Sequence, residues 1–257
     1  MPSLEVLNLT KRYRGLAVVD HVNFTICGGQ IAGYLGPNGS GKSTTVKMLT
    51  GLIEPSSGSI LFNGADVRRD FDAFKRKLGY VPEEAHVYPS LTAMEYLQLV
   101  GRLRGMPEHV LNRKAGDLLK LFSLHLRRHS PLAAYSKGMR QRVLISAALL
   151  HDPDVLIFDE PLSGLDVASI LLFKGVVSEL ASRGKVILYI SHVLEVVERI
   201  CEKVIIIYRG KIMAEEQVSA LREMMNLPSL EAVFTQLVEQ QDTERIAKDI
   251  VDVIQVG

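Results

Sequence analysis

The sequence predicts an α/β fold with a mostly parallel core sheet, an antiparallel β subdomain and an α-helical subdomain. In the second half of the chain, short apolar runs alternate with helical segments, which is typical of a parallel sheet covered on both faces. These runs are residues 155–160, 186–191 and 203–208. Residues 4–9 and 22–26 instead alternate in polarity, which predicts antiparallel pairing. From about residue 88 to residue 149 the apolar positions follow a helical period, which predicts a helical insert.

The composition limits the classes of partner. The 257 residues, 47% of them hydrophobic, suffice for one large or two small domains with a sizeable core. The net charge is +1, so we expect no nucleic-acid partner and no charge-driven binding to an anionic bilayer. Cys27 and Cys201 lie far apart without metal-ligand spacing, which favours buried thiols in a reducing compartment. A disulfide between them stays an open alternative.

No stretch predicts a leader peptide or a membrane span. The first ten residues include Glu5 and have no sustained apolar core. The longest apolar runs, such as 155–158 and 204–208, fall well short of the roughly 20 residues that a spanning helix needs. If the protein acts at a membrane, we expect another chain to supply the membrane part.

The N-terminal part predicts two strands joined by the glycine-containing link 12–20. Tyr13 lies where the first strand is expected to end, and an aromatic ring there can stack on a base. The simpler alternative is a packed aromatic at a strand end.

The stretch GPNGSGKST, residues 36–44, fits the phosphate-loop pattern G-x-x-x-x-G-K-[ST]. An apolar run precedes it and a helix-compatible run follows it, which is the context that this pattern needs. Glycines let successive backbone NH groups turn toward phosphate oxygens, and the helix N-terminus adds its own NH groups. We therefore expect a nucleoside triphosphate here. The alternative is a Gly/Ser-rich turn between a strand and a helix.

Individual roles follow from this expectation. Lys42 can reach the outer phosphates, and the Ser43 hydroxyl suits Mg²⁺. The expected nucleotide-binding residues of the loop are Asn38, Gly39, Ser40, Gly41, Lys42, Ser43 and Thr44.

Further strands are predicted at 59–62, after a Pro-Ser-Ser-Gly turn, and at 78–81, before Pro82. Thr92 can cap the first helix of the insert. Near the C-terminus, apolar residues at helical spacing over 230–238 predict an amphipathic helix, and a weaker stripe follows over 246–254. Such a stripe can dock on its own domain or form a dimer or partner contact, and we favour the first.

Polar residues follow several of the predicted parallel strands. These are Glu83, Asp159 with Glu160, and Ser191 with His192. Ligands of parallel sheets gather at the carboxyl ends of the strands, so we expect these segments to meet the phosphate loop at one site.

At such a site Asp159 can hold Mg²⁺ opposite Ser43, and Glu160 can orient or deprotonate an attacking water. His192 can donate a hydrogen bond to the γ-phosphate or the water. The alternatives are a pair of solvated carboxylates at a strand end and a structural histidine.

The order of these motifs resembles the ATP-binding subunit of an ABC transporter, which implies a P-loop NTPase fold. The resemblance covers about residues 4–215 and rests on the phosphate loop, GYVPE, YSKGMRQR, VLIFDEPLSGLD and ISH. It implies that Ser136 and Gly138, within YSKGMRQR, contact the triphosphate bound to the opposite subunit. Lys137 and Met139 depart from the usual Gly and Gln of this segment. Considered alone, Ser136 is an ordinary helix N-cap.

Other roles are implied by the resemblance. Glu83 stands where the family has a Q-loop glutamine, and a carboxylate there can still reach Mg²⁺. Residues 163–166 match the D-loop, Tyr13 the adenine-stacking aromatic and His192 the switch histidine. The chain is most similar to subunits of ABC-2 type exporters in YSKGM, in Glu83 and in the segment 88–92.

The implied protein is an ATPase with ATP and Mg²⁺ as cofactors. Residues 1–220 would form the ATP-binding domain, with the helical subdomain at about 88–149, and residues 221–257 a C-terminal helical extension. The chain would pair with a second ATP-binding subunit as a homodimer and power transport through a separate integral membrane subunit. It would lie in the cytoplasm on the inner face of the cell membrane. The alternatives are a soluble ABC protein that does not transport, and a regulatory module, suggested by Glu83 and the altered YSKGM segment.

Overall fold

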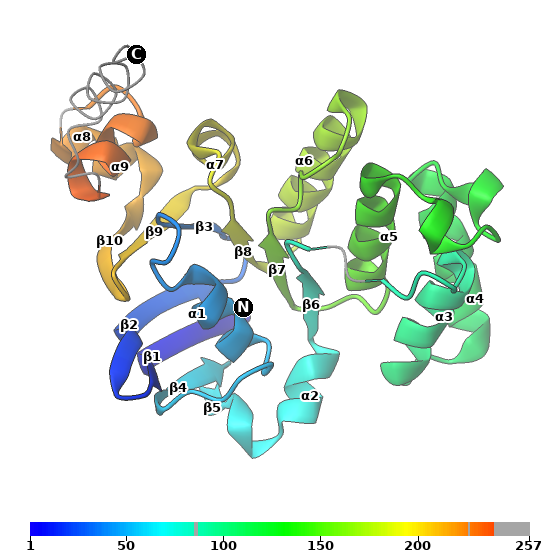
Figure 1. Ribbon diagram of the computed structural model, residues 1–257, viewed down its shortest axis with the longest axis horizontal. Helices are drawn as coiled ribbons and strands as arrows, with labels where there is room; N and C mark the ends of the chain where they lie inside the picture. The colour runs from blue at the N-terminus through cyan, green and yellow to red at the C-terminus, as the bar shows by residue number, and fades with distance from the viewer. Residues whose placement is uncertain (85–86, 226, 239–257) are drawn as a thin grey trace, which may run out of the picture.

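Two sheets form the body of the chain, and a group of helices stands at one end of it (Figure 1). The computed structural model describes residues 1–84, 87–225 and 227–238. In the described residues the smaller sheet has the order β2-β1-β4-β5 and the larger sheet the order β10-β9-β3-β8-β7-β6. The predicted combination of an antiparallel β part, a mostly parallel sheet and a helical part is therefore present.

The smaller sheet is antiparallel throughout, as predicted. Its strands are β1 (Ser3–Tyr13), β2 (Leu16–Cys27), β4 (Ser57–Phe62) and β5 (Ala65–Asp66). The predicted link 12–20 is wrong, because only Arg14 and Gly15 form the turn. Both have positive φ, which closes a tight hairpin. Val19 then continues β2 with its side chain fully buried, a position that suits a β-branched residue.

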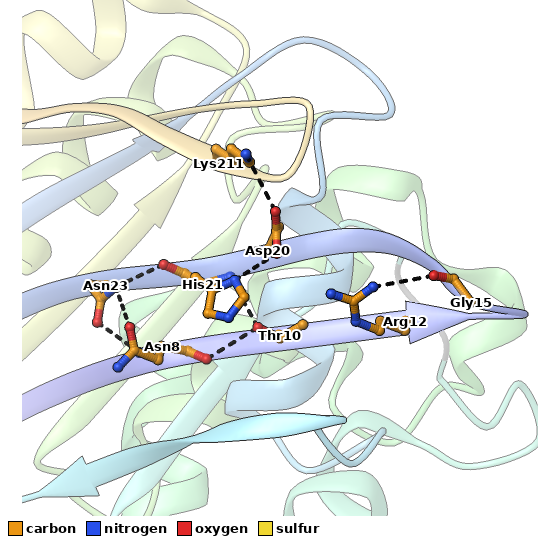
Figure 2. Close-up of polar contacts among 8 residues, drawn as sticks. All are labelled: Asn8, Thr10, Arg12, Gly15, Asp20, His21, Asn23 and Lys211. Atoms are coloured by element: carbon orange, nitrogen blue, oxygen red, sulfur yellow. Dashed lines mark hydrogen bonds and ion pairs between the residues drawn. The ribbon is translucent and has the colours of Figure 1, made fainter.

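The pairing of β1 with β2 is interrupted by shifts in register, and a group of polar side chains fills the interruption (Figure 2). Asn8 and His21 have positive φ at these shifts. The amides of Asn8 and Asn23 face each other, and the Asn8 backbone NH donates to Oδ1 of Asn23 at 2.7 Å. The His21 backbone NH donates to Oγ1 of Thr10 at 3.0 Å. These bonds replace the ladder bonds that the bulges remove.

The larger sheet has a parallel core. Its parallel strands are β3 (Ile31–Leu35), β6 (Leu78–Val81), β7 (Val155–Asp159), β8 (Val186–Ile190) and β9 (Lys203–Tyr208). Every residue of β3, β7 and β8 is buried, which explains their continuous apolar runs. The antiparallel edge strand β10 (Lys211–Gln217) was not predicted, since its partly exposed sequence KIMAEEQ has only a short apolar run, residues 212–214.

The predicted helical insert contains α3 (Ala93–Leu103), α4 (Glu108–Leu121) and α5 (Lys137–Leu149). Thr92 caps α3, as predicted, in a reciprocal capping box with Glu95. The other α-helices described are α1 (Lys42–Leu49), α2 (Phe71–Arg76), α6 (Val167–Ser182), α7 (Leu194–Ile200), α8 (Val218–Met225) and α9 (Leu230–Val238). Short 3-10 turns lie at Val67–Arg69, His125–Arg127 and Leu132–Ala134.

Apolar side chains form a core on each face of the larger sheet. One core lies between the two sheets, where the rings of Phe24 and Tyr34 pack 5.6 Å apart. The other lies under the helices, where Phe158 of β7 meets Phe173 of α6 edge to face at 5.1 Å. Burying each such side chain contributes about 1.5–3 kcal/mol, so the sheet that carries the strand ends is held from both sides.

The C-terminal helices dock on their own chain. Leu230 and Val233 of the predicted amphipathic helix, α9, are buried in the core under the helices, which is the interpretation we favoured. The side chains of Leu237 and Val238 and the weaker stripe 246–254 lie outside the described residues. α8 runs across the predicted boundary at residue 220. In the part of the chain that the structure describes, no helix has the length and apolar character needed to cross a bilayer.

Both cysteines are free thiols. Cys201 is buried, as expected, and its burial raises the pKa of the thiol. The expectation of a buried thiol is wrong for Cys27, which is exposed because it lies where β2 ends beside a turn.

Candidate functional site

The carboxyl ends of four parallel strands meet at a pocket of about 180 Å³. The strands are β3, β6, β7 and β8, and each is followed by one of the segments that the sequence analysis selected. The pocket is lined by Val18, Asn38, Gly39, Gly41, Lys42, Ser43, Thr44, Glu83, Asp159, Glu160, Ile190 and His192. The predicted convergence of these segments on one site is therefore observed.

The loop between β3 and α1 has the geometry of an anion cradle. Gly39 and Gly41 have φ of 77° and 109°, which a residue with a Cβ rarely adopts. Gly41 is also the N-cap of α1 and makes no side-chain cap bond, so the first NH groups of the helix are left for a ligand. The Lys42 Nζ donates to the carbonyl oxygens of Gly36 at 2.6 Å and Pro37 at 3.0 Å, so its charge is held over the loop.

Negative charge collects opposite this cradle. Asp159, at the end of β7, is only 6% exposed. Its burial, with the nearby charges of Glu83 and Glu160, raises the pKa of its carboxyl to about 6, although Lys42 acts in the opposite direction. Burial also lowers the pKa of Lys42, and the three carboxylates partly offset that effect. A bound cation would relieve this crowding of carboxylates.

The donor atoms suit Mg²⁺. Ser43, Asp159 and Glu83 offer oxygen atoms, the ligand type that Mg²⁺ prefers, and all three line the pocket. In the described residues no group of three or more His, Cys, Asp or Glu side chains is arranged to hold a metal by itself. Mg²⁺ usually keeps water and phosphate ligands beside one or two carboxylates, so these residues fit such an ion.

Glu160 and His192 form a connected pair at the neighbouring strand ends. Oε1 of Glu160 lies 2.7 Å from Nδ1 of His192 and accepts from its backbone NH at 2.7 Å. Oε2 of Glu160 accepts from the Ser191 hydroxyl at 3.1 Å. Glu160 itself has φ of 46°, a strained value for a residue with a Cβ. The strained backbone therefore belongs to a residue whose carboxylate lines the pocket.

Four of the expected nucleotide-binding residues do not line the pocket in the single chain. Ser40 is buried behind the loop, where its carbonyl accepts from the NH of Gly210 at 2.9 Å. Tyr13 is 48% exposed at the end of β1, with the Lys11 amine 5.4 Å from its ring centroid. Ser136 caps α5 by accepting from the NH of Met139 at 3.2 Å, and Gly138 lies against Gly164.

Two pocket residues were missed by the sequence analysis. Val18 lies in β2, within the stretch that was predicted to be a link, and Ile190 is the last residue of β8. The valine pair at 18 and 19 is the signal that could have extended β2. Nothing in the local sequence indicates that Val18 reaches the phosphate loop, because its place there depends on how the two sheets pack.

Comparison with known proteins agrees with this geometry. The family model described as ABC transporter matches residues 19–163. The ABC transporter ATP-binding protein NatA of Bacillus subtilis is 37% identical over 84% of this chain and 88% of its own length. The Nod factor export ATP-binding protein I of Ralstonia nicotianae is 38% identical over 83% of this chain and 67% of its own length.

Solved structures agree as well. An ATP-binding subunit of an ABC transporter superposes with a TM-score of 0.86 at 34% identity, over 91% of this chain and 98% of that one. A dimeric ATP-binding cassette in a post-hydrolysis state, bound to ADP and phosphate, gives a TM-score of 0.74 at 25% identity. The match covers 83% of this chain and 98% of that one. The predicted P-loop NTPase fold is thereby confirmed. The chain belongs to the ABC transporter family, as an ATP-binding subunit with that family's ATPase fold.

Proposed function

We propose that this pocket holds the phosphates of ATP with Mg²⁺, and that its strand-end residues direct hydrolysis. The observation that carries the proposal is that Lys42, Asp159, Glu160 and His192 line one pocket with the phosphate loop. Asn38, Gly39, Gly41 and Thr44 complete the cradle around the phosphates, and Ser43, Asp159 and Glu83 would hold Mg²⁺. The ion would neutralise phosphate charge as it develops during the reaction.

The positions of the charged side chains in the pocket support separate roles for Lys42, Glu160 and His192. Lys42 is placed over the loop, where it can leave the carbonyls of Gly36 and Pro37 to meet the outer phosphates. Glu160 orients the attacking water and accepts its proton, while a new P–O bond forms and the bond to the ADP oxygen breaks. His192, fixed by Glu160, donates a hydrogen bond to the γ-phosphate.

A second copy of the chain would complete the site. Ser136 and Gly138 lie outside the pocket of their own chain, at the start of α5, where the positive end of the helix dipole favours an anion. In a head-to-tail dimer they would meet the triphosphate on the other copy, with ATP as the bridge. Tyr13 is exposed near the pocket-lining strand β2 and would stack on the adenine.

A groove beside the pocket supports contact with a membrane subunit. It is lined by Ser43, Lys47, Leu52, Tyr80, Pro82, Glu83, Glu84 and Asp159. Leu52 is 64% exposed there and would be covered by a partner. Glu83 and Asp159 line both the groove and the pocket. A partner bound in the groove would therefore contact residues whose positions depend on the bound nucleotide. The chain would lie on the inner face of the cell membrane through this partner and drive export, as the name of the Nod factor relative suggests for that protein.

The test is size-exclusion chromatography with light scattering on Glu160→Gln, with and without ATP and Mg²⁺. We expect a nucleotide-dependent shift from monomer to dimer, because ATP is bound and not consumed. Adding Lys42→Ala to this variant should abolish the shift. If Glu160→Gln binds ATP and stays monomeric, the composite site of two copies is wrong; if it turns over ATP at the ordinary rate, the role of Glu160 is wrong.

A further inference from the structure

Helix α7 begins two residues after His192 and has few means of holding itself in place. It is seven residues long, and its N-cap, Val193, provides no side-chain cap. Helices this short are unstable alone and take their position from what packs on them. The position of α7 therefore bears on the position of His192.

The larger sheet supports α7 on one side, where Val197 lies against Gly33 of β3, and the C-terminal helices α8 and α9 supply further packing. α9 contacts both α7 and α8, and Val197 of α7 is buried in the same core as Leu230 and Val233 of α9. In Figure 1 α8 and α9 stand at the end of the molecule opposite the helical insert, and α7 lies between them and α6. The C-terminal extension is thus packed on the element that follows the switch histidine.

A half-buried ion pair fixes the contact. The Arg222 Nη1 of α8 donates to Oε1 of Glu198 on α7 at 2.8 Å, and its Nη2 donates to the carbonyl of Pro228 at 2.6 Å. The other oxygen of Glu198 accepts from the backbone NH of Leu230 at 3.3 Å, at the start of α9. One carboxylate on α7 therefore binds both C-terminal helices, and exposure of 22% leaves it partly screened from water.

At the other end of α7 a second set of bonds leads to the pocket. The NH of Val193 donates to the Ser191 hydroxyl at 3.1 Å, and that hydroxyl donates to Glu160. His192 lies between these two residues and is bonded to Glu160 by its ring and its backbone. A shift of α7 would act directly on this segment, because only Val193 separates the helix from His192.

We propose that Arg222 is a positioning residue: through Glu198 it holds α7, and through α7 it holds His192 against Glu160. This inference rests on the proposed function of His192 and Glu160. It makes the C-terminal extension part of the framework of the hydrolytic site, although in the described chain no residue of α8 or α9 lines the pocket.

The test compares ATPase kinetics of Arg222→Ala with the parent chain. We expect kcat to fall by about 3- to 10-fold, with KM for ATP within about twofold, because only the alignment of the reacting groups is disturbed. Arg222→Lys should recover most of the loss, since an ammonium can still pair with Glu198. Glu198→Gln, which keeps an acceptor for the Leu230 NH, should reproduce the loss. The matched control is Arg183→Ala, which breaks an exposed Arg–Glu pair at the C-terminal end of α6.

A second background separates positioning from general destabilisation. In the His192→Ala background, the Arg222→Ala change should have no further effect on kcat, because the side chain that Arg222 positions is already absent. An equal loss in both backgrounds would overturn the inference. Hydrogen exchange gives a readout that needs no turnover: Arg222→Ala should speed exchange of α7 amides, and unchanged exchange would also overturn it.

The same variants distinguish the role proposed for His192 in hydrolysis from the positioning role proposed for Arg222. If His192→Ala itself keeps full activity, the role proposed for His192 fails. If His192→Ala loses activity while Arg222→Ala and Glu198→Gln do not, the role of His192 stands and the positioning role of Arg222 fails.

Discussion

Gly138, at the start of α5, lies directly against Gly164 of the loop that follows β7. A Cβ at position 138 would overlap the carbonyl oxygen of Gly164, so the helix and the loop can approach this closely only with glycine at 138. The segment expected to meet a second subunit and the 163–166 loop are therefore packed together within one chain.

Gly138→Ala tests this contact. Alanine favours a helix over glycine by up to about 1 kcal/mol, so an uncrowded site would be stabilised. Here we expect a loss of about 1–3 kcal/mol in the free energy of unfolding, because the loop must move away from the new methyl group. The control is Gly175→Ala in α6, where nothing lies near the added Cβ and a small gain is expected. Urea unfolding of both variants measures the difference, and stabilisation by Gly138→Ala would contradict the packing argument.

Removal of the His192 ring should affect turnover more than binding. His192→Ala is expected to lower kcat by about 100-fold, in the range of a lost general acid–base or orienting group, with ATP affinity changed only a few-fold. The reason is that the ring would give the γ-phosphate one hydrogen bond and also contacts Glu160, whereas the other phosphate contacts come from the loop and Lys42. His109→Ala, an exposed histidine on α4, serves as control. ATPase assays with nucleotide titration check it, and a large loss of affinity with normal kcat would reverse the assignment.

Lys42→Ala should weaken ATP binding and hydrolysis together. The charge that is held over the loop would be absent from the outer phosphates, and we expect affinity to fall by about 10- to 100-fold, as for one lost charge-assisted contact. Lys120→Ala removes an exposed charge on α4 that is not among the residues lining the pocket, and it should leave the affinity for ATP unchanged. Calorimetric titration with ATP and Mg²⁺ measures both. Equal affinity in Lys42→Ala and the parent chain would remove Lys42 from the phosphate site.

Ionisation of Asp159 lowers the free energy of unfolding of the nucleotide-free chain as pH rises. Its pKa is raised from 3.8 to about 6, so the folded state binds this proton more tightly than the unfolded state. The penalty for ionising Asp159 is absent below about pH 4, develops as pH rises to about 6, and is complete above that. Asp159→Asn should therefore stabilise the metal-free chain by about 1–3 kcal/mol at pH 7.5 and by little near pH 4.

Unfolding of both proteins at these two pH values, without Mg²⁺ or nucleotide, measures the effect. Asp154→Asn offers a control, because that aspartate lies at the opposite end of β7, outside the pocket, and pairs with Lys77 and Lys185. A gain at pH 7.5 that persists unchanged at pH 4 would show that ionisation of Asp159 is not its cause.

The sequence by itself determined the elements whose signals are local. The phosphate loop, the buried runs of β7, β8 and β9, and the Thr92 cap depend on neighbouring residues, so their order could be predicted without the fold. The rule that ligands gather at carboxyl ends of parallel strands then placed Glu83, Asp159, Glu160 and His192 at one site.

Only the tertiary structure decided which distant segments meet. Val18 reaches the pocket because the small sheet packs over the phosphate loop, β10 is a strand because β9 offers it an edge, and Arg222 acts on α7 because α8 folds back onto it. None of these residues has a local pattern that marks its role. A hydrogen bond or ion pair between residues far apart in sequence depends on the packed core that brings them together, and hydrophobic periodicity predicts that such a core forms without predicting which surfaces it joins.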